Sequence, residues 1–445
     1  MKRPFSVCLG LVFGWAAVAC AQQGTDPQDP LLMHRSPVQQ PPPKAVPPRT
    51  PVKRTAEFVG KPVSVAELEQ TLKEVASKPD RDAAHEISQL ALTERLSSPK
   101  LASLLSTLNG EQARSALTEV ADASVFLNLP DSEIFVSAAP DHQEQRRIIA
   151  QAIVYLSEMI PKLPNFYATR TTTRYEDAKD DPKHPGSTIL TGEPLHRAGT
   201  SSNVVLYRNG SETVKPVQAK GRPKYAPEKG LATKGTFGPI LSTVMVDASH
   251  GETSFSHWEQ GANGKEAVFR FVVPKQASHY NVAFRNPPVP SPDQSQEPSS
   301  DTPLTRMLNQ PGTVTAPPAS SSAGGSDNNL AEASGYTADV TIDPATGAIL
   351  RIALQAALDL DSPMLHADIM VEYGAVEIGG QRYICPLKSV SLSRVHSTIL
   401  MRDIFENGTA LGPEVTRLND VTFSDYHLFR GDVRIISSDS EPEKK

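Results

Sequence analysis

The sequence predicts an α+β protein, in which a small N-terminal helical domain is followed by a curved antiparallel sheet packed on one long helix. Apolar residues recur with the period of a helix up to residue 163 and alternate, as in strands, from Phe166 onward. The 445 residues are 38% hydrophobic and 21% charged, which is too polar for a polytopic membrane protein. A net charge of -6 argues against a nucleic-acid partner, because such proteins usually carry a basic surface.

The N-terminus has the features of a secretory signal. Lys2 and Arg3 precede an apolar stretch, Val7 to Ala19, that is too short to span a bilayer as a mature helix. One interpretation is a signal peptide over residues 1–21, which leaves a periplasmic or extracellular protein. The alternative is lipidation of Cys20, which would make the protein an outer-membrane lipoprotein. A membrane contact is expected only in that case.

Proline is unevenly distributed and marks segments that we do not expect to fold. Ten of the 39 prolines lie between Pro27 and Pro62, and nine between Pro287 and Pro318. We expect an unstructured tether over 22–62, an unstructured insertion over 286–333 within one sheet, and a charged unstructured tail over 436–445. The alternative for 286–333 is a linker between two domains.

Short amphipathic helices are predicted between residues 63 and 130. Ser64 and Glu67 form a capping box, and the apolar pattern favours helices over 64–75, 81–93, 98–108 and 111–127. These helices form the predicted helical domain, which could bind an envelope protein partner.

The predicted sheet domain spans residues 141–435. It opens with the longest helical pattern, Asp141 to Leu163, whose wide apolar face we expect to be mostly buried. Strands are predicted over 166–176 and 423–429, with hairpins over 203–217, 253–273, 336–354 and 368–394; residues 237–248 favour a short helix or a strand.

The run Tyr336 to Val395, with its IDPATG turn and its VEYGAVEIGGQRYICPLKSVSLS hairpin, resembles outer-membrane lipoprotein-sorting proteins, the lipoprotein carrier and its receptor. That resemblance implies a half barrel, in which a strongly curved antiparallel sheet wraps around helices. The whole chain, with LPNF leading into TTTRYE and with SHWEQ, also resembles a family of exported bacterial proteins of unassigned function.

If the sheet curves as the resemblance implies, alternating apolar residues line its concave face. A groove of that kind would suit a lipid or the acyl chain of a lipoprotein. The alternative is that the long helix covers the same residues as an ordinary core. The arginine that controls the lid of a carrier is not identified in this sequence, which favours a passive receptor or scaffold. The predicted residues are Phe269, Phe271, Tyr336, Val340, Ile342, Leu350, Ile352, Leu354, Ile369, Val371 and Tyr373.

Catalytic motifs are missing from the sequence, so a non-enzymatic envelope protein without cofactor or metal is the leading hypothesis. The GxSxG, HExxH, Walker A and GxGxxG patterns are all missing. A hydrolase that uses His250 and His257 is a further alternative, although an odd spacing on a strand would direct them to opposite faces. We expect Cys385 to be a buried structural thiol.

Overall fold

The computed structural model describes ten parts of the chain. The predicted signal peptide, Cys20, residues 22–58 of the predicted tether, residues 286–328 and the predicted tail lie outside these parts. The described residues are 59–180, 188–190, 194–216, 230–231, 236–261, 264–285, 329–359, 362, 364–402 and 407–429.

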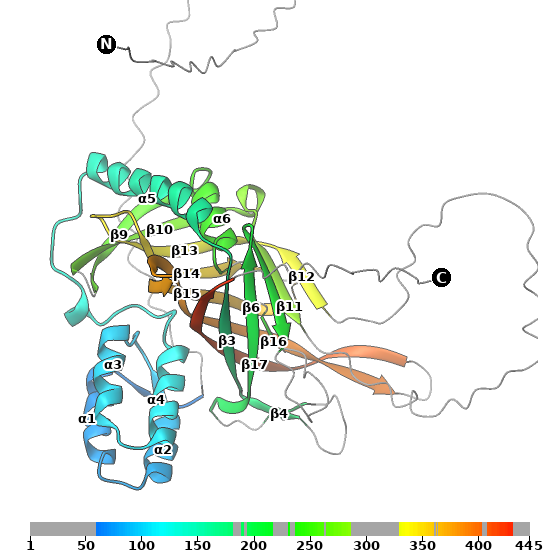
Figure 1. The fold of residues 1–445 in the computed structure, drawn as a ribbon. Coiled ribbons are helices and arrows are strands. Elements are labelled where there is room, and N and C mark those ends of the chain that lie inside the picture. Colours follow the sequence, from blue (N-terminus) through cyan, green and yellow to red (C-terminus); the bar gives the residue numbers. More distant parts are fainter. Residues whose placement is uncertain are drawn as a thin grey trace, which may run out of the picture. The chain divides into compact units, whose positions relative to one another are not determined.

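Four helices near the N-terminus pack around an apolar core of their own (Figure 1). Ser64 and Glu67 form the predicted capping box, in which the Ser64 amide donates to Glu67 Oε2 over 2.7 Å. The Asp80 carboxylate caps the last helix by accepting from the Ala113 amide over 2.8 Å. The four helices are α1 (Val65–Val75), α2 (Asp80–Ser88), α3 (Ser98–Thr107) and α4 (Glu111–Ala123). We call residues 61–129 the helical block.

Three expectations about the helical block and the tether before it are wrong. The helix predicted over 81–93 ends at Ser88, and β2 (Leu90–Leu92) pairs in parallel with β1 (Lys61–Val63). Lys61 and Pro62 are therefore part of the fold and not of an unstructured tether. The apolar run Leu90–Leu92 has only three residues, so its pattern does not distinguish a strand from the end of a helix. The helix predicted over 111–127 likewise ends earlier, at Ala123.

The main sheet has ten antiparallel strands in the order β7-β6-β3-β17-β16-β15-β14-β13-β10-β9. Figure 1 shows that β10, β13 and β14 run in a clearly different direction from β3 and β6, so the sheet is strongly twisted. Tight hairpins form at Asn209-Gly210 and at Gly379-Gly380, where all four residues have positive φ. The strands are β3 (Phe166–Glu176), β6 (His196–Arg208), β7 (Ser211–Pro216), β9 (Glu252–Gly261), β10 (Gly264–Val273), β13 (Gly335–Ile342), β14 (Ile349–Ala357), β15 (Met364–Ile378), β16 (Gln381–Arg402) and β17 (Asn407–Leu428).

The last strand holds the sheet together. β17 is much longer than the predicted strand over 423–429, and it lies between β16 and β3. The strands before residue 217 and those after residue 251 thereby join one sheet. This pairing between distant segments could not be read from local pattern.

Two small sheets complete the strands. β11 (Asn281–Arg285) pairs with β12 (Asn329–Ala333) and with β8 (Gly230–Leu231), and β4 (Ala178–Asp180) pairs with β5 (Thr188–Leu190). Residues 329–333 are therefore a strand, contrary to the expectation that the whole of 286–333 is unstructured. The strands on both sides of 286–328 pair with each other.

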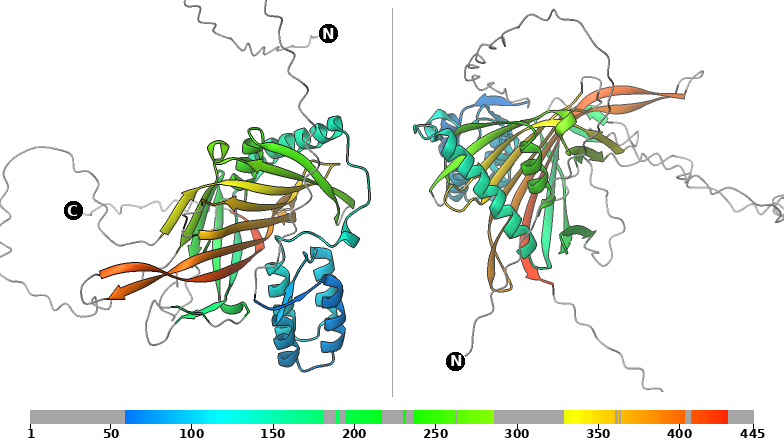
Figure 2. Two further views of the ribbon diagram at one scale, coloured as in Figure 1. Left: turned by 180° about the vertical axis from the view of Figure 1, so that it is seen from behind. Right: turned by 90° about the horizontal axis from the view of Figure 1, so that it is seen from above.

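Two helices cover one face of the main sheet (Figures 1 and 2), which we call the inner face; the opposite face is the outer face. α5 (His142–Lys162) confirms the predicted long helix. Residues 237–248, for which a helix or a strand was predicted, contain the helix α6 (Pro239–Ala248). Short 3-10 turns occur at Asp131–Glu133 and Lys275–Ala277. In the parts of the chain described above, no helix has the length and hydropathy needed to cross a membrane.

Candidate functional site

Ten of the eleven predicted ligand-binding residues gather in one buried cluster on the inner face. The most exposed of them, Tyr373, retains only 6% of its accessible surface. Strand alternation therefore identified the inward positions correctly. The ten residues are Phe269, Phe271, Tyr336, Val340, Ile342, Ile352, Leu354, Ile369, Val371 and Tyr373. We call them the apolar set.

Leu350 is the exception, because a β-bulge interrupts the alternation. Ile342 pairs with Ile349 while its neighbour Thr341 pairs with Arg351, so Leu350 has no opposite residue. Ile349 takes the inward position and is buried, whereas Leu350 is half-buried and outside the core. The prediction of Leu350 as a lining residue is wrong.

α6 covers part of the apolar set and is attached through a buried carboxylate. Four of its side chains are buried in the same core: Ile240, Leu241, Val244 and Met245. Asp247 is fully buried and accepts hydrogen bonds from the Tyr336 hydroxyl (3.1 Å) and the His279 amide (3.0 Å). Burial, together with this carboxylate, raises the pKa of Tyr336 above its usual value. The sequence analysis missed Asp247, although a single acidic residue in an apolar helix was a signal.

α5 covers the rest with a broad apolar face. Ile148, Ala152 and Leu156 are buried, and Ile149, Tyr155, Met159 and Ile160 are half-buried and pack against the same core. The predicted apolar face therefore lies on the core, although Ile153 remains 47% exposed. The helix is also held by Gln151, whose Nε2 donates to the Ala345 carbonyl over 2.8 Å. Each residue of the apolar set is at most 6% exposed, so in the described residues the set is a packed core and not an open groove.

The next strand, β16, carries serines on the inner face. Ser389, Ser391 and Ser393 pair with Val371, Ile369 and Ala367 and so share their face. Each serine is at most 1% exposed. Val390, which alternates with these serines along β16, is also fully buried, on the outer face. Both faces of the central strand β16 are covered, so neither face is exposed to solvent. The alternation of polar and apolar residues along β16 therefore does not show which side chains are exposed.

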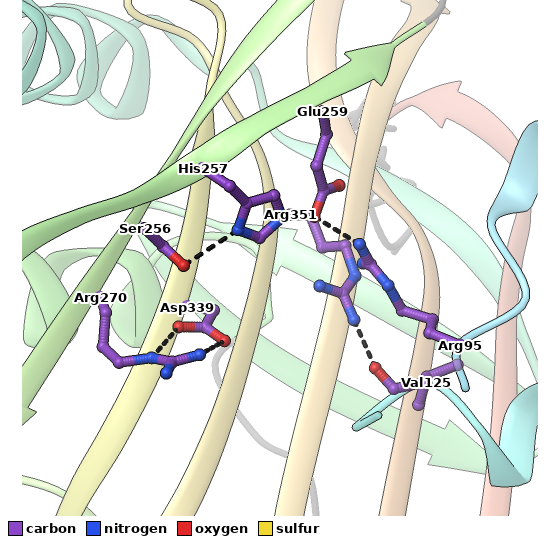
Figure 3. A network of polar contacts seen from close by, with 8 residues as sticks. All are labelled: Arg95, Val125, Ser256, His257, Glu259, Arg270, Asp339 and Arg351. Carbon is purple, nitrogen blue, oxygen red and sulfur yellow. Dashed lines mark hydrogen bonds and ion pairs between the residues drawn. The ribbon is translucent and has the colours of Figure 1, made fainter. Parts of the chain in front are cut away.

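The outer face carries a network of charged side chains where the helical block meets the sheet (Figure 3). Arg95 of the block forms an ion pair with Glu259 of β9, and the Arg351 guanidinium donates to the Val125 carbonyl over 2.6 Å. Burial alone would raise the pKa of Glu259, but Arg95 and a hydrogen bond from His257 outweigh it and hold this pKa at about 2. We call these contacts the outer-face network.

A second buried ion cluster belongs to the outer-face network. Lys388 of β16 lies 2.5 Å from Asp122 of the helical block and 3.6 Å from Asp420 of β17. Burial, and then mutual repulsion, raises the pKa of Asp122, whereas the two carboxylates together keep the pKa of Lys388 above its usual value. Nearby, Val125 and Phe126 pack on Tyr175 and Leu418 of the sheet. The end of the block is therefore attached to the sheet by both charge and apolar contact.

The hydrolase hypothesis gains a contact between Ser256 and His257, but the cavity beside them in the described residues is small. His250 lies just after α6 and bonds Ser249, so it is not brought together with His257. His257 contacts Ser256 Oγ through Nδ1 and Glu259 Oε1 through Nε2, each at 2.9 Å. The cavity beside His257 and Glu259 has about 30 Å³, which is room for water but not for an ester substrate.

Metal and thiol chemistry find no support in the described residues. No group of His, Cys, Asp or Glu side chains there has the spacing of a metal site. Cys385 is 1% exposed, and burial raises the pKa of its thiol to about 12. The prediction of a buried thiol is confirmed.

A larger cavity, of about 460 Å³, lies between the helical block and the start of β6. Arg81, His85, Glu119, His196 and Arg197 are among its lining residues. Burial raises the pKa of Glu119 to about 8. Sequence analysis did not find this cavity, because its walls come from segments about 80 residues or more apart.

Comparisons with known proteins give little further information. No family model matches the chain, and no curated protein matches it. A search of solved structures found a LolA superfamily protein from Nitrosomonas europaea, with 7% sequence identity, over 63% of this chain and 94% of that one. The TM-score is 0.21, and a similarity this low carries no argument about fold or function.

Proposed function

We propose that this chain is an exported, non-enzymatic protein of a bacterial cell envelope that binds the acyl chain of a lipid or lipoprotein. The ligand would lie between the inner face of the sheet and the helices α5 and α6, and would displace α5 on entry. The apolar set is large, contiguous and aromatic, as sites for apolar ligands usually are.

The observation that carries this proposal is the apolar character of the contact between α5 and the core that contains the apolar set. Ile148, Ala152 and Leu156 are buried in this core, and four half-buried side chains of α5 pack against it: Ile149, Tyr155, Met159 and Ile160. Displacing α5 would therefore break mainly apolar contacts. An acyl chain could replace those contacts with its own.

Uptake of N-phenyl-1-naphthylamine, an uncharged probe that fluoresces in apolar surroundings, tests the proposal. We expect the purified protein to bind the probe, and Gln151→Ala to accelerate uptake several-fold, because this change removes the hydrogen bond from α5 to Ala345. Glu158→Gln is the control, since Glu158 contacts Lys162 on the same helix. Absence of probe binding, together with native mass spectra that show no bound lipid on protein from its own envelope, would contradict the proposal.

The non-enzymatic part has a separate test. Ser256 contacts His257, but the adjoining cavity is too small for an acyl substrate. We expect a fluorophosphonate probe to leave Ser256 unlabelled. Labelling that is lost in His257→Ala would instead favour the hydrolase.

A further inference from the structure

A grid of polar side chains lies beside the apolar set on the inner face. Three cross-strand rows run from β16 through β17 to β3, and eight of their nine residues are polar. The neighbouring residues on β15 are Ala367, Ile369 and Val371, so the boundary between polar and apolar surface lies between β15 and β16. The rows are Ser393-Arg417-Glu176, Ser391-Asn419-Arg174 and Ser389-Val421-Thr172, which we call the hydroxyl grid.

Several side chains of the hydroxyl grid have no hydrogen-bond partner. The Oγ atoms of Ser389, Ser391 and Ser393 and the Oγ1 atom of Thr172 find none among the parts of the chain that the structure describes. These four residues are at most 1% exposed, so water on the surface does not reach them either. Nε of Arg417 also lacks a hydrogen bond, although it lies 3.5 Å from Glu176 Oε2.

So many unpaired hydroxyls on adjacent strands need a physical explanation. A buried hydroxyl without a partner destabilises a fold, and alanine or valine would fill a central strand without that penalty. Most buried polar atoms in folded proteins are paired. A molecule that accepts hydrogen bonds, held on the grid, would provide the missing partners.

The small sheet supplies a cover for this position. The Leu231 carbonyl of β8 accepts from Asn419 Nδ2 over 3.4 Å, and the Phe284 ring of β11 lies 5.7 Å from the Arg417 guanidinium. Gly230 permits this approach, because a Cβ atom there would be 3.3 Å from Asn419 Nδ2 and its φ is +98°. The small sheet thus covers the grid at Asn419 and Arg417.

We propose that the hydroxyl grid binds the phosphate-ester head of an amphipathic ligand whose acyl chain lies on the apolar set. The unpaired hydroxyls and the Nε–H group of Arg417 can all donate hydrogen bonds, and phosphate and ester oxygens accept them. The polar surface adjoins the apolar one within a single strand spacing, as an amphipathic molecule requires. This inference rests on the proposed function, because it adds the head to a ligand whose chain that function binds.

Calorimetric titration with palmitoyl lysophosphatidylglycerol tests the inference. We expect Ser391→Ala combined with Ser393→Ala to weaken binding about tenfold, and Ser391→Ala alone about threefold, because each change removes a donor to the head. Thr341→Val is the matched control. Its Oγ1 atom is likewise buried and unpaired among the described residues, but Thr341 lies on the outer face, so we expect unchanged affinity.

Two further probes separate this inference from the proposed function. If the double variant binds the lysolipid as tightly as the wild type while both bind N-phenyl-1-naphthylamine, the grid assignment is wrong and the acyl-binding function stands. If neither probe binds the wild type, both proposals fail. If glycerol 3-phosphate binds as tightly as the lysolipid, the site takes a phosphate without a chain, and the amphipathic assignment is overturned.

Discussion

The two faces of the main sheet are covered in different ways. On the inner face, α5 and α6 pack on the sheet mainly through apolar side chains, and the hydroxyl grid beside them contains buried groups without partners. On the outer face, buried ion pairs such as Arg95–Glu259 and Lys388–Asp122 attach the helical block in addition to the apolar contacts of Val125 and Phe126. Apolar burial scales with area and does not depend on pH, whereas ion pairs depend on specific partners and on their protonation.

The largest effect should come from the inner face. Phe269 is completely buried and its ring packs on Phe255. We expect Phe269→Ala to lower the free energy of unfolding by about 3–5 kcal/mol, measured by urea denaturation, because it leaves a cavity in the core. Val246→Ala is the control, since Val246 of α6 is 53% exposed, and it should change stability by less than about 0.5 kcal/mol. Equal effects would mean that α6 and the sheet do not share a packed core.

On the outer face, removal of one member of an ion pair should cost somewhat less. The side chains of Arg95 and Glu259 are 8% and 12% exposed. We expect Arg95→Met to destabilise the protein by about 3 kcal/mol, because it leaves Glu259 charged and buried.

The double variant Arg95→Met with Glu259→Met sharpens this comparison. Two apolar side chains can pack without desolvating a charge, so we expect most of the lost stability to return in the same denaturation experiment. A double variant as unstable as the single one would show that the pair holds the block by geometry that methionine cannot replace.

pH should also distinguish the two faces, through carboxyl groups on and beside the outer face. The pKa of Glu119 is raised to about 8, so its contribution to stability is present below pH 4.5 and is lost as pH rises toward 8. We expect Glu119→Gln to stabilise the protein on the order of 2 kcal/mol at pH 8 and much less at pH 4.5, measured by urea midpoints.

The contribution of Glu259 to stability should change with pH in the opposite direction. Its pKa is held at about 2, so its contribution is present above pH 4.5 and is lost as pH falls toward 2. In Glu259→Gln, the free energy of unfolding should therefore decrease less steeply as pH falls from 4.5 toward 2. A pH profile identical to that of the wild type would argue against the ion pair with Arg95.

The smallest change in stability is expected when either of two buried serines is replaced by alanine. Ser391 has no partner in the described residues, whereas Ser334 donates to the Gly335 and Ala357 carbonyls, and each is 1% exposed. We expect Ser391→Ala to raise the free energy of unfolding by up to about 1 kcal/mol without ligand, and Ser334→Ala to lower it by about 1 kcal/mol. A loss of stability in both variants would reveal a partner for Ser391.

Local pattern predicted many elements correctly, because local interactions determine them. The capping box at Ser64 and the turns at Asn209-Gly210 and Gly379-Gly380 act within a few residues, so their positions follow from residue types alone. The bounds of α5 follow from the Asp141 cap and the prolines near its end. Ten of the eleven apolar residues were placed on the correct face for the same reason.

Failures occurred where a short run or a bulge altered the pattern. Leu90–Leu92 forms a strand only because Lys61–Val63 lies beside it. Leu350 leaves the inner face because one extra residue enters β14 opposite Thr341 and Ile342. Neither neighbour is visible in a local window.

By itself, the sequence determined where most helices and turns and many strands form, and which residues of most strands share a face. Only the tertiary structure decided what covers each face: α5 and α6 on the apolar set, β8 and β11 on Asn419 and Arg417 beside the buried serines, and the helical block on Glu259 and Lys388. The physical reason is that alternation follows from backbone geometry over a few residues. Burial and electrostatics instead depend on segments that folding brings in from far along the chain.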